Sequence, residues 1–421
     1  MPKYHIWTIG CQMNKAESEA LNIRFAQLGY ETTDIADEAD VIILNSCVVR
    51  ESAENRVVNK LKALRVWKKA HPGVKLALTG CLVGANVAQL QKSFPHVDHF
   101  FRAGETPKWL EGEKIQAIAA VPDKVAVPCT YVSIIQGCNN FCSYCIVPFR
   151  RGRERSRPMT DIVCEVRELA RRGVREVTLL GQNVNSYGHD LAKGGYLSDL
   201  LKELNGIDDL YRIRFLTNHP KDLSDSLIDA MASLNKVCEN INLPVQAGDN
   251  DILKLMRRDY TVEQYRELVG QLRNRVKGLA LSTDIIVGFP GETEVQFENT
   301  MKLLKELRFD MVHVAAYSPR AGTASARELD DDVPAEEKKR RLDDVEALQA
   351  KIKTELNASL LGQEVEVLVE EKKDDKWKGR TRTDKLVFLN ADDDLIGQLV
   401  HVTIEKTGPW SLQGKMNKRG V

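Results

Sequence analysis

Residues 136–145 read QGCNNFCSYC, and within this stretch Cys138, Cys142 and Cys145 follow one another at spacings of four and three residues. The apolar run at residues 131–135 leads into them and predicts a buried strand. The glycine between the strand and the cysteines lets the backbone turn, so we expect the thiols on one loop at the strand's carboxyl end. Structural zinc takes four protein ligands, whereas three thiolates on a four-iron cluster leave one iron open to a small molecule. The spacing favours an iron–sulfur cluster over a zinc-binding or redox-sensitive loop.

Beyond the loop, strand patterns alternate with helix patterns, which predicts a partial β/α barrel that is open on one side. The predicted strands cover residues 131–136, 176–181, 212–217, 240–245, 280–288 and 311–317. The predicted helices cover residues 160–172, 197–204, 224–234, 251–257, 261–276 and 294–307. We expect the active site at the carboxyl ends of these strands, where small, amide and hydroxyl residues suit an amino acid and a ribose.

Residues 1–125 also alternate strand and helix patterns, which predicts a parallel α/β sheet with helices at residues 15–28, 52–69 and 86–93. Cys11, Cys47 and Cys81 each follow a strand pattern. Because the carboxyl ends of parallel strands meet at one edge of a sheet, we expect these thiols to converge on a second three-thiolate site. The alternative is three unrelated buried thiols. Three further cysteines without spaced partners are expected to be packing residues: Cys129, Cys164 and Cys238.

Two basic stretches are candidate RNA contacts. The first follows the cysteine loop directly and consists of Arg150, Arg151, Arg153, Arg155 and Arg157. Arginine suits phosphate, so we favour RNA contact over a solvated loop, although some of these side chains can pair with carboxylates inside the protein. The second consists of Lys372, Lys373, Lys376, Trp377, Lys378, Arg380 and Arg382. An aromatic side chain among basic residues can stack a base, and an ordinary exposed hairpin is the alternative.

The C-terminal part of the chain predicts a linker and a small domain. Residues 335–361 predict a long charged helix that Gly362 ends. Residues 363–421 alternate in the manner of strands at residues 364–370, 385–389 and 399–404, which predicts a small β-barrel. The expected domains are therefore 1–125, 126–334, a linker at 335–362, and 363–421.

The chain has 421 residues, of which 43% are hydrophobic and 29% are charged, and its formal net charge is zero. This length predicts two or three domains, and the neutral charge requires any RNA surface to be a local patch. The sequence shows no signal-peptide pattern or long apolar span, so we expect a cytoplasmic protein with no membrane attachment. In that reducing compartment the nine cysteines suit metal or catalytic roles better than disulfides.

Several of these strings resemble one enzyme family over essentially the whole chain. CNNFCSYC resembles the CxxxCxxC signature of radical S-adenosylmethionine (SAM) enzymes, with Tyr144 as the aromatic residue before the last cysteine. GCNNFCSYCIVPFRRGRERSRP resembles the methylthiotransferases of that superfamily, and LLGQNVNSYG resembles the subgroup that makes 2-methylthio-N6-isopentenyladenosine in tRNA. DIIVGFPGETE resembles the superfamily's SAM-contacting segment, and WKGRT and SLQGK look like a TRAM domain, an RNA-binding module.

The resemblance implies a sulfur insertion and a methyl transfer at C2 of N6-(dimethylallyl)adenosine, at tRNA position 37 next to the anticodon. It implies two [4Fe-4S] clusters, one on Cys138, Cys142 and Cys145 and an auxiliary one on Cys11, Cys47 and Cys81, and two SAM molecules per turnover. An electron donor such as flavodoxin or ferredoxin and a sulfur donor are the expected further partners. The implied fold is an α/β sheet domain, a partial (β/α)6 radical SAM barrel and a small OB-like β-barrel.

Particular residues are expected to contact the cofactor and the RNA. The expected SAM contacts are Tyr144, Gln182, Asn183, Gln246 and Gly288. The expected RNA contacts are Arg150, Arg151, Arg157, Lys376, Trp377 and Arg380. Family members often read HLPxQSG where this chain has Asn242 and Ala247 at the positions of the histidine and the serine, so the roles of these two positions stay open.

Two alternatives to this function stay open. The first is the same chemistry on threonylcarbamoyladenosine in tRNA or on a ribosomal-protein aspartate; those sister groups tend to differ at the LLGQNVNSYG strand end. The second is a non-catalytic iron–sulfur protein that binds RNA through its C-terminal barrel.

Overall fold

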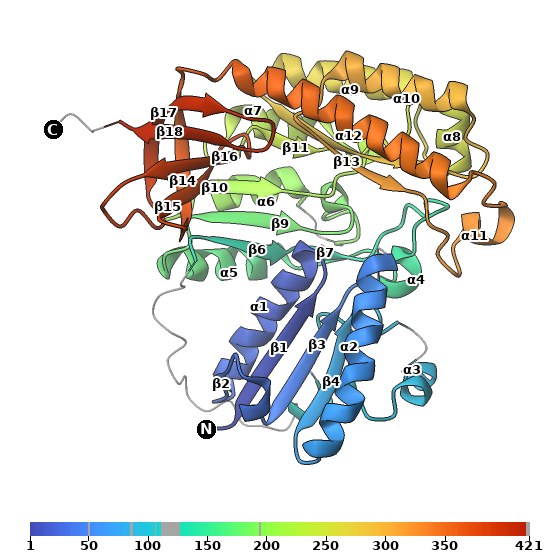
Figure 1. Cartoon of the computed structure of the whole chain (residues 1–421). Helices are drawn as coiled ribbons and strands as arrows, with labels where there is room; N and C mark the ends of the chain where they lie inside the picture. The colour runs from blue at the N-terminus through green and yellow to red at the C-terminus, as the bar shows by residue number, and fades with distance from the viewer. Residues whose placement is uncertain (49–50, 85–86, 106, 111–126, 193–194, 418–421) are drawn as a thin grey trace. The chain divides into compact units, whose positions relative to one another are not determined.

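The computed structural model describes residues 1–48, 51–84, 87–105, 107–110, 127–192 and 195–417 of the chain. The chain folds into two compact units (Figure 1). The first comprises Met1–Asp123, Gln136–Asn139 and Ile146–Glu154, and the second comprises Lys124–Ile135, Asn140–Cys145 and Arg155–Val421. The domain boundary expected at residues 125–126 and the helix start expected at residue 86 lie outside the described residues.

A parallel sheet forms the first unit, with the strand order β2-β1-β3-β4-β5, as predicted. Its strands are β1 (Lys3–Ile9), β2 (Glu31–Thr32), β3 (Val41–Ser46), β4 (Lys75–Gly80) and β5 (His99–Phe100), and its helices are α1 (Gln12–Gln27), α2 (Glu51–Ala70), α3 (Val87–Ser93) and α4 (Val147–Arg151). Successive side chains of a strand point to opposite faces. Ile42 accordingly packs in one apolar cluster with Leu61 of α2, and Ile43 in another with Phe25 of α1. Helices therefore cover both faces of the sheet.

The second unit contains the predicted partial β/α barrel (Figure 1). Parallel strands form two sheets, β10-β9-β6 and β11-β12-β13, and a bridge between Ile213 and Val237 continues the order from one to the other. These strands are β6 (Cys129–Ser133), β9 (Glu176–Leu180), β10 (Arg212–Phe215), β11 (Asn240–Asn242), β12 (Ala280–Val287) and β13 (Met311–Ala316). The surrounding helices are α5 (Met159–Arg171), α6 (Leu197–Asn205), α7 (Asp225–Ser233), α8 (Asn250–Leu255), α9 (Val262–Arg275), α10 (Glu294–Leu307) and α11 (Ala324–Glu328). The predicted units are thus confirmed, with one continuous apolar core.

Three strands, β6, β10 and β11, end earlier than predicted, at Ser133, Phe215 and Asn242. The prediction carried β10 to residue 217, but Thr217 has φ 66°, in the left-handed region that β-branched residues rarely adopt. Its hydroxyl donates to the Gly181 carbonyl at 2.5 Å, which holds this turn against the end of β9. Likewise β11 ends at Asn242, and Gln246 has φ 74°. The carboxyl end of β10 is therefore a turn.

Capping residues set where the barrel helices begin. The Thr261 hydroxyl accepts from the Gln264 N–H at 3.3 Å, and the Gln264 side chain accepts from the Thr261 N–H at 2.8 Å, which is a capping box at α9. Thr293 and Gln296 form the same box at α10. The predicted and observed starts of these helices agree to within one residue because this signal is local in sequence.

The C-terminal part contains a long helix and a closed barrel. Helix α12 spans Ala335–Ala358 and buries Val345 and Ile352. The barrel order is β14-β15-β16-β18-β17, formed by β14 (Glu364–Lys373), β15 (Lys376–Thr381), β16 (Leu386–Asn390), β17 (Leu399–Thr407) and β18 (Leu412–Met416). The small barrel is confirmed, but β15 and β18 were not predicted as strands. In β15 the inward-facing residues are Trp377, Gly379 and Thr381. These residues do not give the apolar alternation by which a strand is predicted.

Arginines on β10 fix this barrel to the amino ends of the β/α strands. Arg212 is fully buried and donates to the Arg380 carbonyl at 2.7 Å, and Arg214 donates to the carbonyls of Thr381 and Arg382, both at 2.7 Å. In return, Arg382 pairs with Glu239 at 2.7 Å. Arg382, which the sequence placed in a candidate RNA-binding stretch, therefore joins the two parts of this unit.

Short elements complete the described chain: β7 (Ile135–Gln136), β8 (Arg155–Ser156), η1 (Ala36–Glu38), η2 (Lys108–Leu110), η3 (Val184–Ser186) and η4 (Pro220–Asp222). Among the described residues, no helix combines the length and the apolar character needed to cross a membrane.

Candidate cluster and cofactor sites

Cys11, Cys47 and Cys81 lie together at the carboxyl edge of the first unit's sheet. Ile9 of β1 pairs with Ser46 of β3, and Ser46 pairs with Gly80 of β4, so each cysteine follows a strand at the same level. The Cys47 thiol hydrogen-bonds to both neighbours, which lowers the pKa of Cys11 to about 6 and that of Cys81 to about 7. The predicted convergence of these three thiols is confirmed.

Buried amides and a tight turn hold these cysteines in place. The Asn14 side chain accepts from the Cys11 N–H at 3.2 Å and donates to Asn45 at 2.9 Å and to the Ser46 carbonyl at 3.0 Å. Gly80 has φ 90°, and a Cβ on it would lie 2.3 Å from the Ser46 carbonyl oxygen. Only glycine fits this turn, which places Cys81 beside the end of β3.

Arg151 of the first unit contacts this thiol group. Its Nε donates to the Cys81 Sγ at 3.1 Å, and its Nη1 pairs with Glu17. Both side chains are only 6% exposed. The expected RNA contact at Arg151 is therefore wrong, because the guanidinium is buried and engaged by a carboxylate and a thiol. The alternative that some of these arginines pair inside the protein holds for this residue.

Arg157 and Arg150 have different surroundings. Arg157 in the second unit donates to the Ser133 carbonyl at 2.7 Å and pairs with Glu165 at 2.5 Å, so it also fits the internal alternative better than an RNA contact. Arg150 is half-buried, and its Nε has no hydrogen-bond partner within the described part of the chain. An RNA contact at Arg150 stays a prediction.

A second buried arginine contacts the cysteine loop. Arg258 Nη1 donates to the Cys142 Sγ at 3.4 Å, its Nη2 donates to the Pro244 carbonyl at 2.9 Å, and its Nε donates to the Tyr260 hydroxyl at 2.8 Å. The side chain is 8% exposed. Its neighbour Arg257 instead forms a surface pair with Glu328. Sequence reasoning missed Arg258, since two adjacent arginines give no sign of which one turns inward.

The loop segment of the second unit is anchored by its backbone. The Ser143 N–H donates to the Met256 carbonyl at 3.0 Å, and its hydroxyl donates to the Leu255 carbonyl at 2.7 Å. The next residue, Tyr144, packs edge-on against the buried ring of Phe289 with 6.5 Å between ring centroids, and burial raises the pKa of its phenol. Cys142 and Cys145 are thus carried by a segment that is anchored at Ser143 and Tyr144.

The strand ends of the barrel carry two buried amide oxygens that could accept from a ligand. Asn183 donates to Asp222 at 2.7 Å, and Asn218 donates to the Asn242 carbonyl at 2.8 Å. The side-chain oxygens of both asparagines are buried without a hydrogen-bond partner in the described residues. Unpaired buried acceptors are costly, so these atoms suit the ammonium or ribose hydroxyls of SAM.

For the other expected SAM contacts, the structure gives the position in the fold but no unpaired atom that faces a ligand among the described contacts. Gln182 lies just beyond the end of β9, and Gln246 is 9% exposed with its N–H donating to the Asp284 carbonyl at 2.9 Å. Gly288 has φ 65°, and a Cβ there would lie 2.3 Å from the Lys338 side chain. The close approach that this glycine permits is therefore made by Lys338, and SAM contacts at these positions stay predictions.

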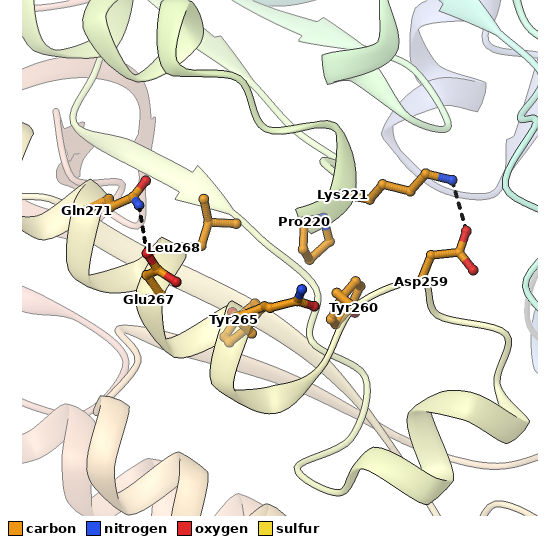
Figure 2. A pocket seen from close by; sticks show the side chains of 9 residues that line it. Pro220, Lys221, Asp259, Tyr260, Tyr265, Glu267, Leu268 and Gln271 are labelled. Atoms are coloured by element: carbon orange, nitrogen blue, oxygen red, sulfur yellow. Dashed lines mark hydrogen bonds and ion pairs between the residues drawn. The ribbon is translucent and has the colours of Figure 1, made fainter.

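A pocket of about 350 Å³ opens beside the start of α9 (Figure 2). Its lining residues are Pro220, Lys221, Asp259, Tyr260, Gln264, Tyr265, Glu267, Leu268 and Gln271. Two of these lining residues, Lys221 and Asp259, form an ion pair at 2.9 Å, which a dashed line in Figure 2 marks. Tyr260, which accepts from Arg258, connects the wall of this pocket to Cys142.

The C-terminal barrel corrects one expected RNA contact. Trp377 is 4% exposed in the barrel core, and its indole N–H donates to the Ala391 carbonyl at 3.1 Å. It cannot stack a base, because strand alternation turns it inward and Lys376 outward. Arg380 pairs with Asp384 at 3.0 Å and Glu370 at 3.3 Å. RNA contacts at Lys376 and Arg380 stay predictions.

The three cysteines without spaced partners differ in exposure. Cys238 is buried and Cys129 is partly buried, as expected for packing residues. Cys164 is exposed on α5, so its predicted packing role is wrong. The helix pattern located this residue correctly, but it did not resolve which face of the helix Cys164 occupies.

Comparison with known proteins agrees with this architecture. Residues 132–304 match the family model of the Radical SAM superfamily, residues 3–102 match Uncharacterized protein family UPF0004, and residues 358–416 match the TRAM domain. A radical SAM methyltransferase, TsrM from Kitasatospora setae, shares the fold with a TM-score of 0.54 and 14% identity, covering 77% of each chain. Fold and family match together define a radical SAM enzyme.

Full-length relatives narrow this class. The tRNA-2-methylthio-N(6)-dimethylallyladenosine synthase of Dehalococcoides mccartyi is 54% identical over 418 residues, which is 99% of each chain. That of a Roseiflexus species is 46% identical over 429 residues, covering 98% of this chain and 89% of the relative. The chain belongs to the family of tRNA-2-methylthio-N(6)-dimethylallyladenosine synthases.

Membership of this superfamily implies SAM and [4Fe-4S] clusters as cofactors. The donor set of the first unit fits, because its three thiols converge and Arg151 donates to one of them. In the second unit, Arg258 donates to the thiol of Cys142. The described side chains include no group of three His, Cys, Asp or Glu arranged for a single metal ion.

Proposed function

We propose that this protein is a tRNA methylthiotransferase that converts N6-(dimethylallyl)adenosine at tRNA position 37 into its 2-methylthio derivative. The observation that carries the proposal is the 54% identity with a synthase of this name over 99% of both chains. The strand-end placement of Cys11, Cys47 and Cys81 supports it, since such an enzyme needs a sulfur-handling site apart from its radical-generating loop.

The radical-generating loop would be Cys138, Cys142 and Cys145. When bound there, the cluster supplies one electron that cleaves SAM to methionine and a 5′-deoxyadenosyl radical, which can abstract hydrogen from an unactivated carbon. The protein's own part is to hold the cluster and to orient SAM. Arg258 holds the Cys142 thiolate, and the free amide oxygens of Asn183 and Asn218 accept from SAM.

The auxiliary site would be Cys11, Cys47 and Cys81, which hold the cluster that handles sulfur. Thiolates are the metal-binding form of cysteine, and the lowered pKa values of Cys11 and Cys81 favour that form at neutral pH. A second SAM supplies the methyl group. The other site residues expected from the sequence, Tyr144, Gln182, Gln246 and Gly288, are proposed SAM contacts.

The proposed partners follow from this chemistry. The substrate is tRNA that already carries the dimethylallyl group. An electron donor such as flavodoxin or ferredoxin must reduce the loop cluster, and a sulfur donor must restore the auxiliary site. We propose a cytoplasmic location, where the tRNA and these donors would be present. We propose domains at 1–125, 126–334 and 363–421, with the linker at 335–362.

The related functions are less well supported. The relatives compared above carry the name of the dimethylallyladenosine enzyme rather than of a threonylcarbamoyladenosine or ribosomal-protein enzyme. A non-catalytic iron–sulfur protein would not require the free acceptors at the barrel's strand ends.

Mass spectrometry of tRNA nucleosides tests the proposal. Cells lacking this protein should contain N6-(dimethylallyl)adenosine without its 2-methylthio form, and re-expression should restore that form. Anaerobic reconstituted protein with dithionite and SAM should release 5′-deoxyadenosine. Appearance of methylthio-threonylcarbamoyladenosine instead would assign the sister activity, and absence of SAM cleavage would leave only the binding protein.

A further inference from the structure

We propose that Arg151 and Glu17 form a charge pair that sets the reduction potential of the auxiliary cluster. Arg151 acts as a positioning residue that holds Cys81 and stabilises the more negative, reduced state of the cluster, and Glu17 limits that stabilisation. The inference rests on the proposed function, because it requires a [4Fe-4S] cluster on Cys11, Cys47 and Cys81.

The first argument is the burial of the pair. The side chains of Arg151 and Glu17 are each 6% exposed, so solvent screens them weakly. A buried arginine is retained only where its charge and its N–H groups find partners. Two nitrogens of the Arg151 guanidinium have such partners. Nε donates to the Cys81 Sγ at 3.1 Å, and Nη1 pairs with the Glu17 carboxylate.

The second argument is the remaining nitrogen of the guanidinium. Arg151 Nη2 is buried, and it has no hydrogen-bond partner among the residues that the structure describes. A buried donor without an acceptor is costly, which points to a ligand that completes it. A cluster ligated by Cys81 carries sulfur atoms that would supply the acceptor, since the same guanidinium already reaches that cysteine.

The third argument is the opposite sign of the two charges. Hydrogen bonds and net charge near the sulfur atoms set the potential of an iron–sulfur cluster. A cation beside the thiolates favours the reduced state and raises the potential, whereas a carboxylate opposes that effect. Neutralising Arg151 should therefore lower the potential, and neutralising Glu17 should raise it. A merely structural pair would not give shifts of opposite sign.

The test measures one cluster at a time in the full-length chain. In a background with Cys138, Cys142 and Cys145 changed to Ala, the reconstituted protein should hold about four irons. Redox titration followed by electron paramagnetic resonance then gives the midpoint potential. Arg151→Gln should lower the potential by about 59 mV, a tenfold change in the one-electron equilibrium, and Glu17→Gln should raise it by a similar amount. Arg153→Gln is the matched control, an exposed arginine two residues away.

The possible results distinguish failure of the charge-pair proposal from failure of the auxiliary cluster. Unchanged potentials, or shifts of both variants in the same direction, would overturn the charge-pair proposal while leaving the cluster in place. If Arg151→Gln does not retain iron, Arg151→Lys keeps the charge, and its potential should stay closer to that of the parent than the Glu17→Gln value does. A parent without its four irons would instead refute the auxiliary cluster and the proposed function with it.

Discussion

The two sets of three cysteines are built in different ways. Cys138, Cys142 and Cys145 belong to one eight-residue stretch, whereas Cys11, Cys47 and Cys81 come from three strands separated by more than thirty residues each. The loop set depends on local sequence and on a few backbone anchors. The strand-end set depends on the register of a whole parallel sheet. Damage to the sheet should therefore remove one site and spare the other.

The two sets also differ in the charge beside them. Arg151 near Cys81 is offset by the buried carboxylate of Glu17. Arg258 near Cys142 contacts a phenol and a carbonyl, which leave its positive charge uncompensated at those contacts. The two arginines therefore differ in whether a carboxylate balances their charge.

The largest expected effect separates the two sets by function. Cys142→Ala removes a ligand of the loop set, so 5′-deoxyadenosine formation and all tRNA modification should be abolished. Cys47→Ala removes a ligand of the strand-end set only, so SAM cleavage should persist while methylthiolation fails. Anaerobic assays with chromatography of the nucleoside products measure both. Fully methylthiolated tRNA from Cys47→Ala would remove the strand-end set from the mechanism.

Changes at two glycines test whether each set depends on its own turn. Gly80→Ala forces a side chain onto φ 90° against the Ser46 carbonyl, and Gly137→Ala forces one onto φ 80° at 2.0 Å from the Arg153 carbonyl. Each substitution should cost about 2 kcal/mol of stability. Iron analysis should show Gly80→Ala losing the strand-end cluster and Gly137→Ala losing the loop cluster.

Gly73→Ala is the control for both, because a Cβ there has nothing within 4 Å among the described atoms and its backbone is not left-handed. It should retain all of the roughly eight irons expected from two four-iron clusters. Equal loss of both clusters in the Gly80 variant would show that the two sets are not independent.

The adjacent arginines of the second unit give a smaller effect. Arg258→Gln removes the cation from Cys142, so the reduction potential of the loop cluster should fall. The rate of SAM cleavage should fall about tenfold, as is typical for residues that orient metal ligands. Arg257→Gln, at a side chain that is 50% exposed, should change neither. Spectroscopic potentials and single-turnover cleavage measure the two quantities. A slower rate with an unchanged potential would mean that Arg258 only packs.

The smallest effects concern the C-terminal barrel. Lys376→Ala should weaken tRNA binding and reduce its salt slope by about one phosphate contact. Trp377→Phe should leave tRNA affinity unchanged and lower the melting temperature, because the indole lies in the core and loses its bond to Ala391. Binding titrations at several salt concentrations distinguish them. Lost affinity in the Trp377 variant would restore the base-stacking prediction.

A structural feature could be predicted from the sequence where the residues that determine it lie close together in the chain or follow a general rule of folding. The capping boxes at Thr261 and Thr293 are local, and α9 and α10 begin where predicted. The convergence of Cys11, Cys47 and Cys81 needed only the rule that parallel strands end together. Trp377 was misplaced because a basic strand whose inward residues are tryptophan, glycine and threonine shows no apolar alternation.

Arginine partners could not be predicted at all. Arg151 and Arg157 lie in a run of charges that resembles a phosphate-binding surface, and only the tertiary structure brings Glu17 and Glu165 to them. Arg258 shows the converse case, since nothing in its neighbourhood of sequence distinguishes it from Arg257. The partner of a long cation is set by residues far away in the chain.

The way in which Arg212 and Arg214 hold the C-terminal barrel has an evolutionary consequence. Their guanidinium groups donate hydrogen bonds to the main-chain carbonyls of residues 380–382. Arg212 also donates to the carboxylate of Glu366. Main-chain oxygens persist whatever side chain a residue carries. The outward side chains of β15 are therefore free to drift, or to be exchanged between homologues, without loosening the docking. This arrangement lets the side chains on the barrel's outer surface vary while its main-chain attachment stays constant.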